Sequence, residues 1–190
     1  MNGRDAEYAA LRATIRERGT ARVWVFATGI VAWAALSIAT AALASTPVAT
    51  LLPLLVLASI FEAIFALHVG GERIGRYLQV FYEAGAAPSV PPDPSGLPDP
   101  RGLPGWEHAA MAFGRPAGAV TIDALFVVPF LIATLFNAAP AMIVDPAREE
   151  LIVIGGAHLL FVLRLIVARQ AAGKQRAIDL ARFQTLRDHQ

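Results

Sequence analysis

The chain has 190 residues, of which 56% are hydrophobic and 16% are charged, and its formal net charge is +1. A soluble domain usually contains about a quarter charged residues and a nucleic-acid binder usually has a basic face, so neither class is favoured and no nucleic-acid partner is expected. The sequence contains no cysteine, which excludes disulfides, iron–sulfur clusters and thiol catalysis.

The apolar residues are concentrated in long runs, which we interpret as membrane spans. A helix that crosses the hydrocarbon core needs about 20 mostly apolar residues, and each run reaches or approaches that length. The runs are Val23–Ala44, Val48–Val69, Ala117–Val144 and Leu151–Ala168. The sequence therefore predicts an all-α integral membrane protein, with four transmembrane helices arranged as a bundle.

The first 22 residues are predicted to form a cytoplasmic amphipathic helix that leads into the first span. Tyr8, Leu11 and Ile15 recur at helical spacing, and several arginines precede the span. Residues 169–190 repeat this pattern after the fourth span. Lys and Arg that flank membrane spans tend to stay on the cytoplasmic side. Both termini are therefore predicted to lie in the cytoplasm, with the spans in the inner membrane.

The two short turns have no such excess of basic residues. "ASTPVAT" has no charge, and "DPAREE" has one arginine and three acids, so both are predicted to face outward. Residues 23–69 and 117–168 then form two antiparallel hairpins. Residues 70–116 connect them in the cytoplasm as a helical extension followed by a loop rich in proline and glycine. This loop is either a semi-rigid spacer or a docking segment for a protein partner.

The stretch "HVGGERIGRYLQVFYE" has the pattern of an amphipathic helix. Its polar face consists of His68, Glu72, Arg76, Gln79 and Glu83. We expect this face to be solvated, with local ion pairs between residues one turn apart, such as Glu72 and Arg76.

An alternative interpretation of the same stretch is a divalent-metal site. His68 and Glu72 lie one turn apart, and Glu107 and His108 follow at the far end of the loop. Imidazole and carboxylate groups together can hold zinc, iron or manganese. The paired Glu-x-x-His pattern and the H-E-x-x-H pattern are both absent, so the first expectation is that the chain has no cofactor.

Ionisable side chains inside spans are energetically costly and therefore indicate candidate functional positions. Counting helical rise places Glu62, Asp123 and Arg164 at one level, about 20 Å from the outer surface. We expect these three side chains to face the bundle interior and meet, with Thr28 at a similar level. The cluster would either stabilise the packing of the spans or load and release a proton or cation.

His158 is a further ionisable residue within the spans. It lies about 12 Å from the outer surface, whereas His68 lies about 18 Å deeper, so one haem iron cannot bind both. We therefore expect His158 to be a packing residue that forms hydrogen bonds. Asn137, between Pro129 and Pro140, is a second candidate for such a role.

No catalytic constellation is found, and an enzyme is not expected. The first functional hypothesis is a small interaction or scaffold protein of the inner membrane, such as an accessory subunit of a larger complex. One alternative is an oligomeric proton or ion channel or carrier that uses the Glu62, Asp123 and Arg164 level. Another is a membrane metalloprotein with a cytoplasmic His/Glu site. The expected partners are the lipid bilayer and either another protein or further copies of the chain.

Overall fold

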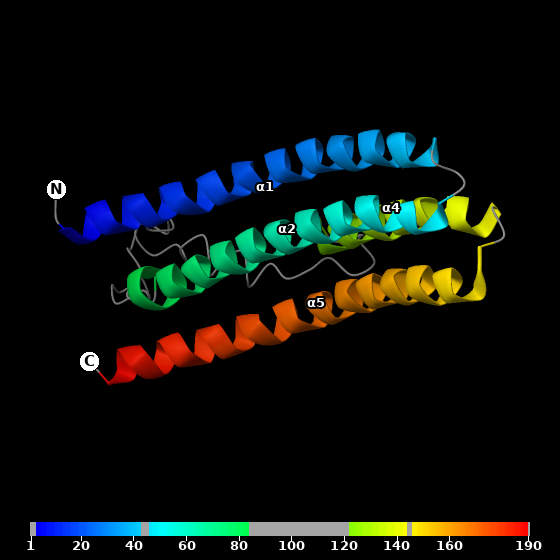
Figure 1. Ribbon diagram of the computed structural model, residues 1–190. Coiled ribbons are helices and arrows are strands. Elements are labelled where there is room, and N and C mark those ends of the chain that lie inside the picture. Colours follow the sequence, from blue (N-terminus) through cyan, green and yellow to red (C-terminus); the bar gives the residue numbers. More distant parts are fainter. Residues whose placement is uncertain (1–2, 43–45, 84–121, 144–145, 190) are drawn as a thin grey trace, which may run out of the picture. The chain divides into compact units, whose positions relative to one another are not determined.

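The structure, a computed structural model, describes residues 3–42, 46–83, 122–143 and 146–189, without the side chains of residues 122–126 (Figure 1). Every element in this part of the chain is helical, which confirms the predicted all-α class. In chain order the elements are α1 (Gly3–Ala41), a 3₁₀ turn (Pro47–Thr50), α2 (Leu51–Leu78), a π-helical end (Gln79–Glu83), α4 (Ile122–Ile143) and α5 (Arg148–Asp188).

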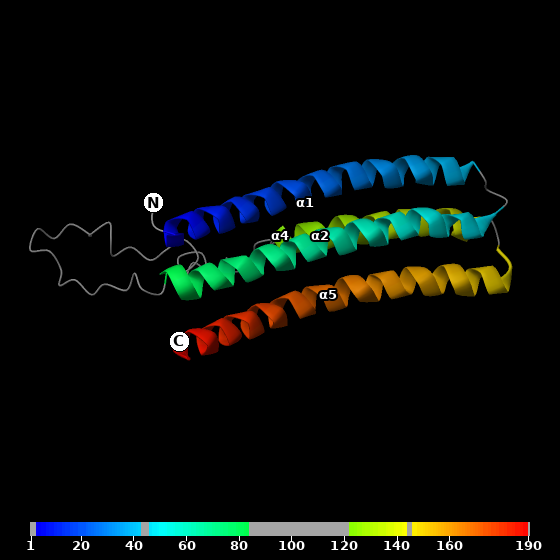
Figure 2. The ribbon, with the colours of Figure 1, turned by 60° about the vertical axis from the view of Figure 1, so that its left-hand side comes forward.

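Three helices are long and apolar enough to cross a membrane: α1, the helix from Pro47 to Glu83, and α5. Helix α1 has 39 residues and α5 has 41. At the usual rise per residue each is about 60 Å long, which is about twice the thickness of a hydrocarbon core. Figure 2 shows that both are continuous ribbons. These helices support a membrane localisation, and the fully described part of α4 is a shorter apolar helix, Val127–Ile143.

The chain forms two compact units. One, which we call the apolar unit, comprises Gly19–His68 and Val120–Ala171. The other, which we call the polar unit, comprises Met1–Arg18, Val69–Ala119 and Ala172–Gln190.

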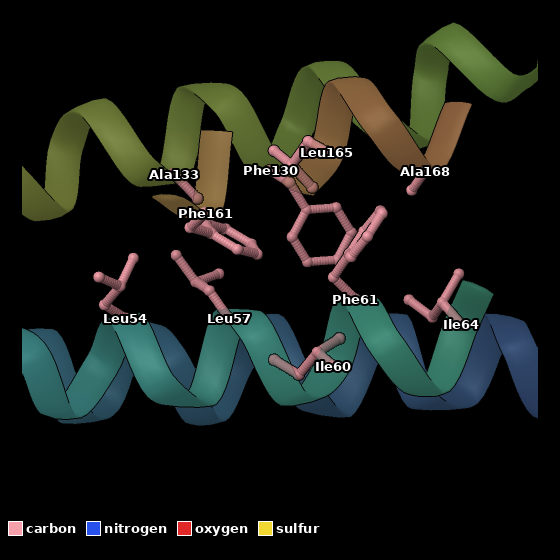
Figure 3. Close-up of a cluster of buried hydrophobic side chains, with 10 residues drawn as sticks. All are labelled: Leu54, Leu57, Ile60, Phe61, Ile64, Phe130, Ala133, Phe161, Leu165 and Ala168. Carbon is pink, nitrogen blue, oxygen red and sulfur yellow. The ribbon is translucent and has the colours of Figure 1, made fainter. Parts of the chain in front are cut away.

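The core of the apolar unit is built from α2, α4 and α5 (Figure 3). Its centre is a set of three phenylalanines, one from each helix: Phe61, Phe130 and Phe161. The Phe61 and Phe130 rings meet edge to face at a centroid distance of 5.4 Å. Such edge-to-face contacts favour one fixed packing of the rings. The aliphatic and small residues around them are Leu54, Leu57, Ile60, Ile64, Ala133, Leu165 and Ala168.

Prolines occupy two kinds of position in these helices. Pro47 begins the 3₁₀ turn before α2, where a missing N–H costs little. Pro129 and Pro140 lie inside α4. The helix runs through both positions, as membrane helices can when neighbouring groups satisfy the freed carbonyls.

Candidate functional site: an exposed ion pair in the apolar unit

The main feature of the apolar unit is an ion pair between Glu62 of α2 and Arg164 of α5. Arg164 Nε lies 2.7 Å from Glu62 Oε1, and Nη2 lies 2.8 Å from Oε2. This is the bidentate geometry in which the planar guanidinium matches a carboxylate, and it is the strongest form of such a contact. Two residues that are 102 positions apart are thereby joined between two helices.

Aromatic side chains of α2 support the guanidinium from one side. The Arg164 Cζ atom lies 5.1 Å from the centre of the Phe65 ring and 6.0 Å from that of Phe61. Phe61 also belongs to the buried core. A cation over a ring face is attracted by the ring quadrupole, so these contacts hold the arginine in one orientation.

The ion pair lies on the outside of the apolar unit, contrary to the expectation that it faces the interior. The side chains retain relative exposures of 49% for Glu62 and 38% for Arg164. The reason is rotational: Glu62 follows the core residue Phe61 by one position, which turns its side chain about 100° around the helix. The interior at this level is filled by large apolar side chains.

The pair has unused hydrogen-bonding capacity. A guanidinium has five N–H donors and a carboxylate has about four acceptor sites, whereas the pair uses two of each. Among the described residues, Arg164 Nη1 has no hydrogen-bond partner. Asp123 lies in α4, but its side chain is outside the described part of the structure, so its predicted contact with Arg164 stays a prediction.

The face of α2 around Glu62 is exposed and consists mostly of small or aliphatic residues. The exposed positions recur at alternating intervals of three and four residues: Leu52, Leu55, Ser59, Glu62 and Ala66. Ala63 is exposed beside them. The Ser59 hydroxyl donates a hydrogen bond to the Leu55 carbonyl at 2.9 Å, so it is satisfied within its own helix.

Thr28 does not take part in the ion pair. It is exposed on α1, and its hydroxyl donates to the Trp24 carbonyl at 2.7 Å. This local bond is the usual way in which a threonine satisfies its hydroxyl inside a helix.

A second polar group in the apolar unit is buried, and its side chains form hydrogen bonds with one another and with backbone carbonyls. His158 Nδ1 lies 2.8 Å from the Ile154 carbonyl, and its Nε2 lies 3.0 Å from Asn137 Nδ2. The same Asn137 nitrogen donates to the Thr50 carbonyl at 2.8 Å. If Nδ1 carries the proton, every contact has one donor and one acceptor. The network thus joins α4, α5 and the 3₁₀ turn before α2, and the structure places His158 and Asn137 in direct contact.

The residues of the proposed metal site have other partners. His68 Nδ1 lies 3.0 Å from Arg22 Nη1. Glu72 accepts two hydrogen bonds from Arg176, one of them at 3.0 Å from Nη2. Glu107 and His108 lie outside the described residues. Within the described part of the chain, no group of three or more His, Cys, Asp or Glu residues is placed to hold a metal.

The polar face predicted for residues 68–83 is not a solvated one. Arg76, Gln79 and Glu83 are all buried. Arg76 Nη1 donates to Gln79 Oε1 at 2.9 Å, and Glu83 lies 4.0 Å from Arg12. A polar stripe predicts solvent exposure only when no other polar element covers it. Here Gln79 and Glu83 have polar partners within the fold, whereas Arg76 Nε is buried without a hydrogen-bond partner in the described part of the chain.

Long-range ion pairs and aromatic contacts organise the polar unit. Besides Arg176 and Glu72, Arg73 pairs with the buried Asp179 of α5 at 3.1 Å. The sequence analysis did not identify Arg176 and Asp179 as pairing residues. The signal that could have identified them is the opposite charge of residues in segments 70–83 and 169–190. Tyr77 donates a hydrogen bond to Glu7 Oε1 at 3.1 Å. Burial and this bond to Glu7 raise the pKa of Tyr77.

No protein-family model matches the chain, and no curated protein or solved structure matches it significantly. What this chain does is therefore inferred from its own residues.

Proposed function

We propose that this protein is an interaction subunit of a larger assembly in the cytoplasmic membrane. It catalyses no reaction in this proposal. Its role is to hold other polypeptides at the membrane through the exposed face of α2 and α5.

The observation that supports this proposal is the exposure of the Glu62–Arg164 ion pair. The pair lies on helices that are apolar enough to cross a membrane, and yet its side chains are about half exposed. Lipid tails offer no hydrogen bonds, and an unsatisfied polar group in hydrocarbon costs several kcal/mol. A protein partner with polar groups at the same depth would remove this cost.

The proposed topology has four spans, with both termini and the segment 70–116 in the cytoplasm. The support is the distribution of Lys and Arg, which are frequent in the first 22 and the last 22 residues and scarce in the two short turns. In this arrangement Glu62 and Arg164 lie in the inner half of the bilayer, about 8 Å from the inner boundary of the hydrocarbon.

A proton or cation carrier receives less support from the same pair. Both oxygens of Glu62 accept hydrogen bonds from one arginine, so loading a proton would require this bidentate contact to break. The hypothesis stays a prediction because it also involves the side chain of Asp123.

The test is native mass spectrometry of the protein extracted gently from its own membrane. We expect an assembly heavier than one chain, which is lost or weakened in Glu62→Gln. Glu149→Gln is a matched control, because it removes an exposed carboxylate from the first turn of α5. A wild-type spectrum that contains only the single chain with bound lipid would contradict the proposal.

A further inference from the structure

The order of the two charges in the exposed ion pair indicates which partner fits it. Two copies of one membrane protein that share the same topology can be related by a two-fold axis along the membrane normal. This rotation reverses every direction in the membrane plane. When the two ion pairs face each other across this axis, Glu62 of one copy therefore lies opposite Arg164 of the other, and Arg164 lies opposite Glu62. Opposite charges meet at both positions.

The unused hydrogen-bonding groups are complementary in the same way. Arg164 keeps its Nη1 donors, and each oxygen of Glu62 keeps acceptor capacity after its bond to Arg164. In a two-fold dimer the free donors of each copy face the free acceptors of the other. The two ion pairs would form one closed ring of alternating charges, with no net charge left exposed to lipid.

The shape of the surrounding surface allows two copies to approach closely. Ser59, Ala63 and Ala66 are small and exposed on α2, beside Glu62. Small residues let helix backbones come together in membranes. The alternating intervals of three and four residues from Leu52 to Ala66 are those of a left-handed helix pair, so the stripe stays in contact with a partner helix along its length.

From these observations we infer that the chain forms a two-fold homodimer through α2, in which Glu62 and Arg164 of each copy bond to Arg164 and Glu62 of the other. This inference rests on the proposed function, because it names the partner of the same face. A lipid headgroup fits less well, because the ion pair is neutral and its arginine fork already holds a carboxylate. A different membrane protein would need the same alternating charges at the same depth.

The first experiment uses the absence of cysteine from the chain. Ser59→Cys places one thiol on the proposed interface, and oxidation or a short bis-maleimide in native membranes should then yield a crosslinked homodimer. Val31→Cys is the matched control. It is exposed on α1, 68% for the wild-type residue, and both positions lie about 12 Å from the inner boundary of the hydrocarbon. Equal crosslinking at both positions would contradict the inference.

The second experiment tests the charge pattern itself. The double variant Glu62→Arg with Arg164→Glu keeps an ion pair within each chain and keeps self-complementarity between two variant copies. In a mixed dimer, by contrast, the wild-type Glu62 would face the glutamate introduced at position 164, and the two arginines would also face each other. Wild-type and variant chains with different tags, expressed together, should therefore each pair with themselves. Mixed dimers should fall well below the share expected from random pairing.

The possible results separate this inference from the proposed function. Self-sorting of the two charge patterns together with crosslinking at position 59 supports the homodimer. Random mixing of the two chains overturns it, even if dimers form. An adduct of Ser59→Cys with a different protein overturns the homodimer but supports the interaction subunit. A single chain in every spectrum and no adduct at position 59 would overturn both. Wild-type helical content in circular dichroism establishes that each variant is folded.

Discussion

Two polar groups of the apolar unit differ in how their hydrogen bonds are arranged. The contacts of His158 and Asn137 form a closed set, in which every contact has one donor and one acceptor when His158 Nδ1 carries the proton. The contacts of Glu62 and Arg164 are open, because donors and acceptors of both groups still point outward. In a low-dielectric environment a closed network stabilises a fold, whereas an open one is stable only when a further partner completes it.

The closed network leads to a prediction for Asn137→Leu. The substitution removes the contacts of Asn137 Nδ2 with His158 Nε2 and with the Thr50 carbonyl, and places an apolar side chain against the buried His158 ring. We expect a loss of unfolding free energy on the order of 1–2 kcal/mol, the range for side-chain hydrogen bonds between membrane helices. Denaturant titration in detergent micelles measures it.

The control for this prediction is Thr28→Val, which removes a hydroxyl that bonds only to its own helix on an exposed face. It should change stability by less than about 0.5 kcal/mol, as exposed substitutions usually do. Equal effects of the two substitutions would contradict the network's role. The nitrogen chemical shifts of His158 provide a second check, since they should report the proton on Nδ1.

The sequence predicted which residues meet at one level better than it predicted the direction of their side chains. Counting helical rise placed Glu62 and Arg164 at one level, and the structure joins them at 2.7 Å. It did not predict that both lie on the outside, because the side chains that fill the interior depend on how α2, α4 and α5 are rotated. A single sequence does not give the rotation of each helix about its axis, so it cannot distinguish a charge that faces inward from one that faces outward.

Between elements, the contact of α1 with α2 depends on a glycine. A Cβ atom added at Gly29 would lie 2.5 Å from Ile60 Cγ1 and 2.6 Å from Ile60 Cδ1. Ile60 belongs to the core, so its side chain has little freedom to move away. The missing side chain at position 29 thus sets how closely the two helices approach.

We therefore predict that Gly29→Leu destabilises the packing of α1 on α2 by about 1–3 kcal/mol, the usual cost of overpacking. The matched control is Gly19→Leu in the same helix, where an added Cβ meets nothing within 4 Å. It should be neutral or stabilising because leucine is a better helix former than glycine. Thermal unfolding in micelles measures both. A smaller effect at position 29 than at position 19 would contradict the close approach, and Gly29→Leu with Ile60→Ala should recover part of the loss.

The helical segments themselves were largely predictable from the sequence, and their partners were not. Runs of apolar residues and flanking arginines predicted long helices, and α1 and α5 have that form. The amphipathic pattern of residues 68–83, however, suggested local pairing of Glu72 with Arg76. The structure pairs Glu72 with Arg176, which is 104 positions away. Sequence periodicity describes one helix at a time, so it carries no information on which charge of another helix lies opposite.

For the chain as a whole, the distribution of charge predicts one threading through the membrane. Basic residues are frequent before the first predicted span, between the second and third, and after the fourth. The two short turns have at most one. Because moving Lys and Arg across a membrane during insertion is unfavourable, all three basic segments should stay on the same side.

The last prediction tests this threading with single cysteines in a chain that has none of its own. Thr46→Cys and Ala147→Cys lie at exposed positions between helices, and Asp5→Cys and Gln184→Cys lie at exposed positions near the two ends. A membrane-impermeant maleimide added to intact cells should label positions 46 and 147 and leave positions 5 and 184 unlabelled. Permeabilised cells are the control, in which all four should react. Labelling of position 5 in intact cells would reverse the orientation. Opposite results for positions 5 and 184 would mean an odd number of spans and would contradict the four-span threading.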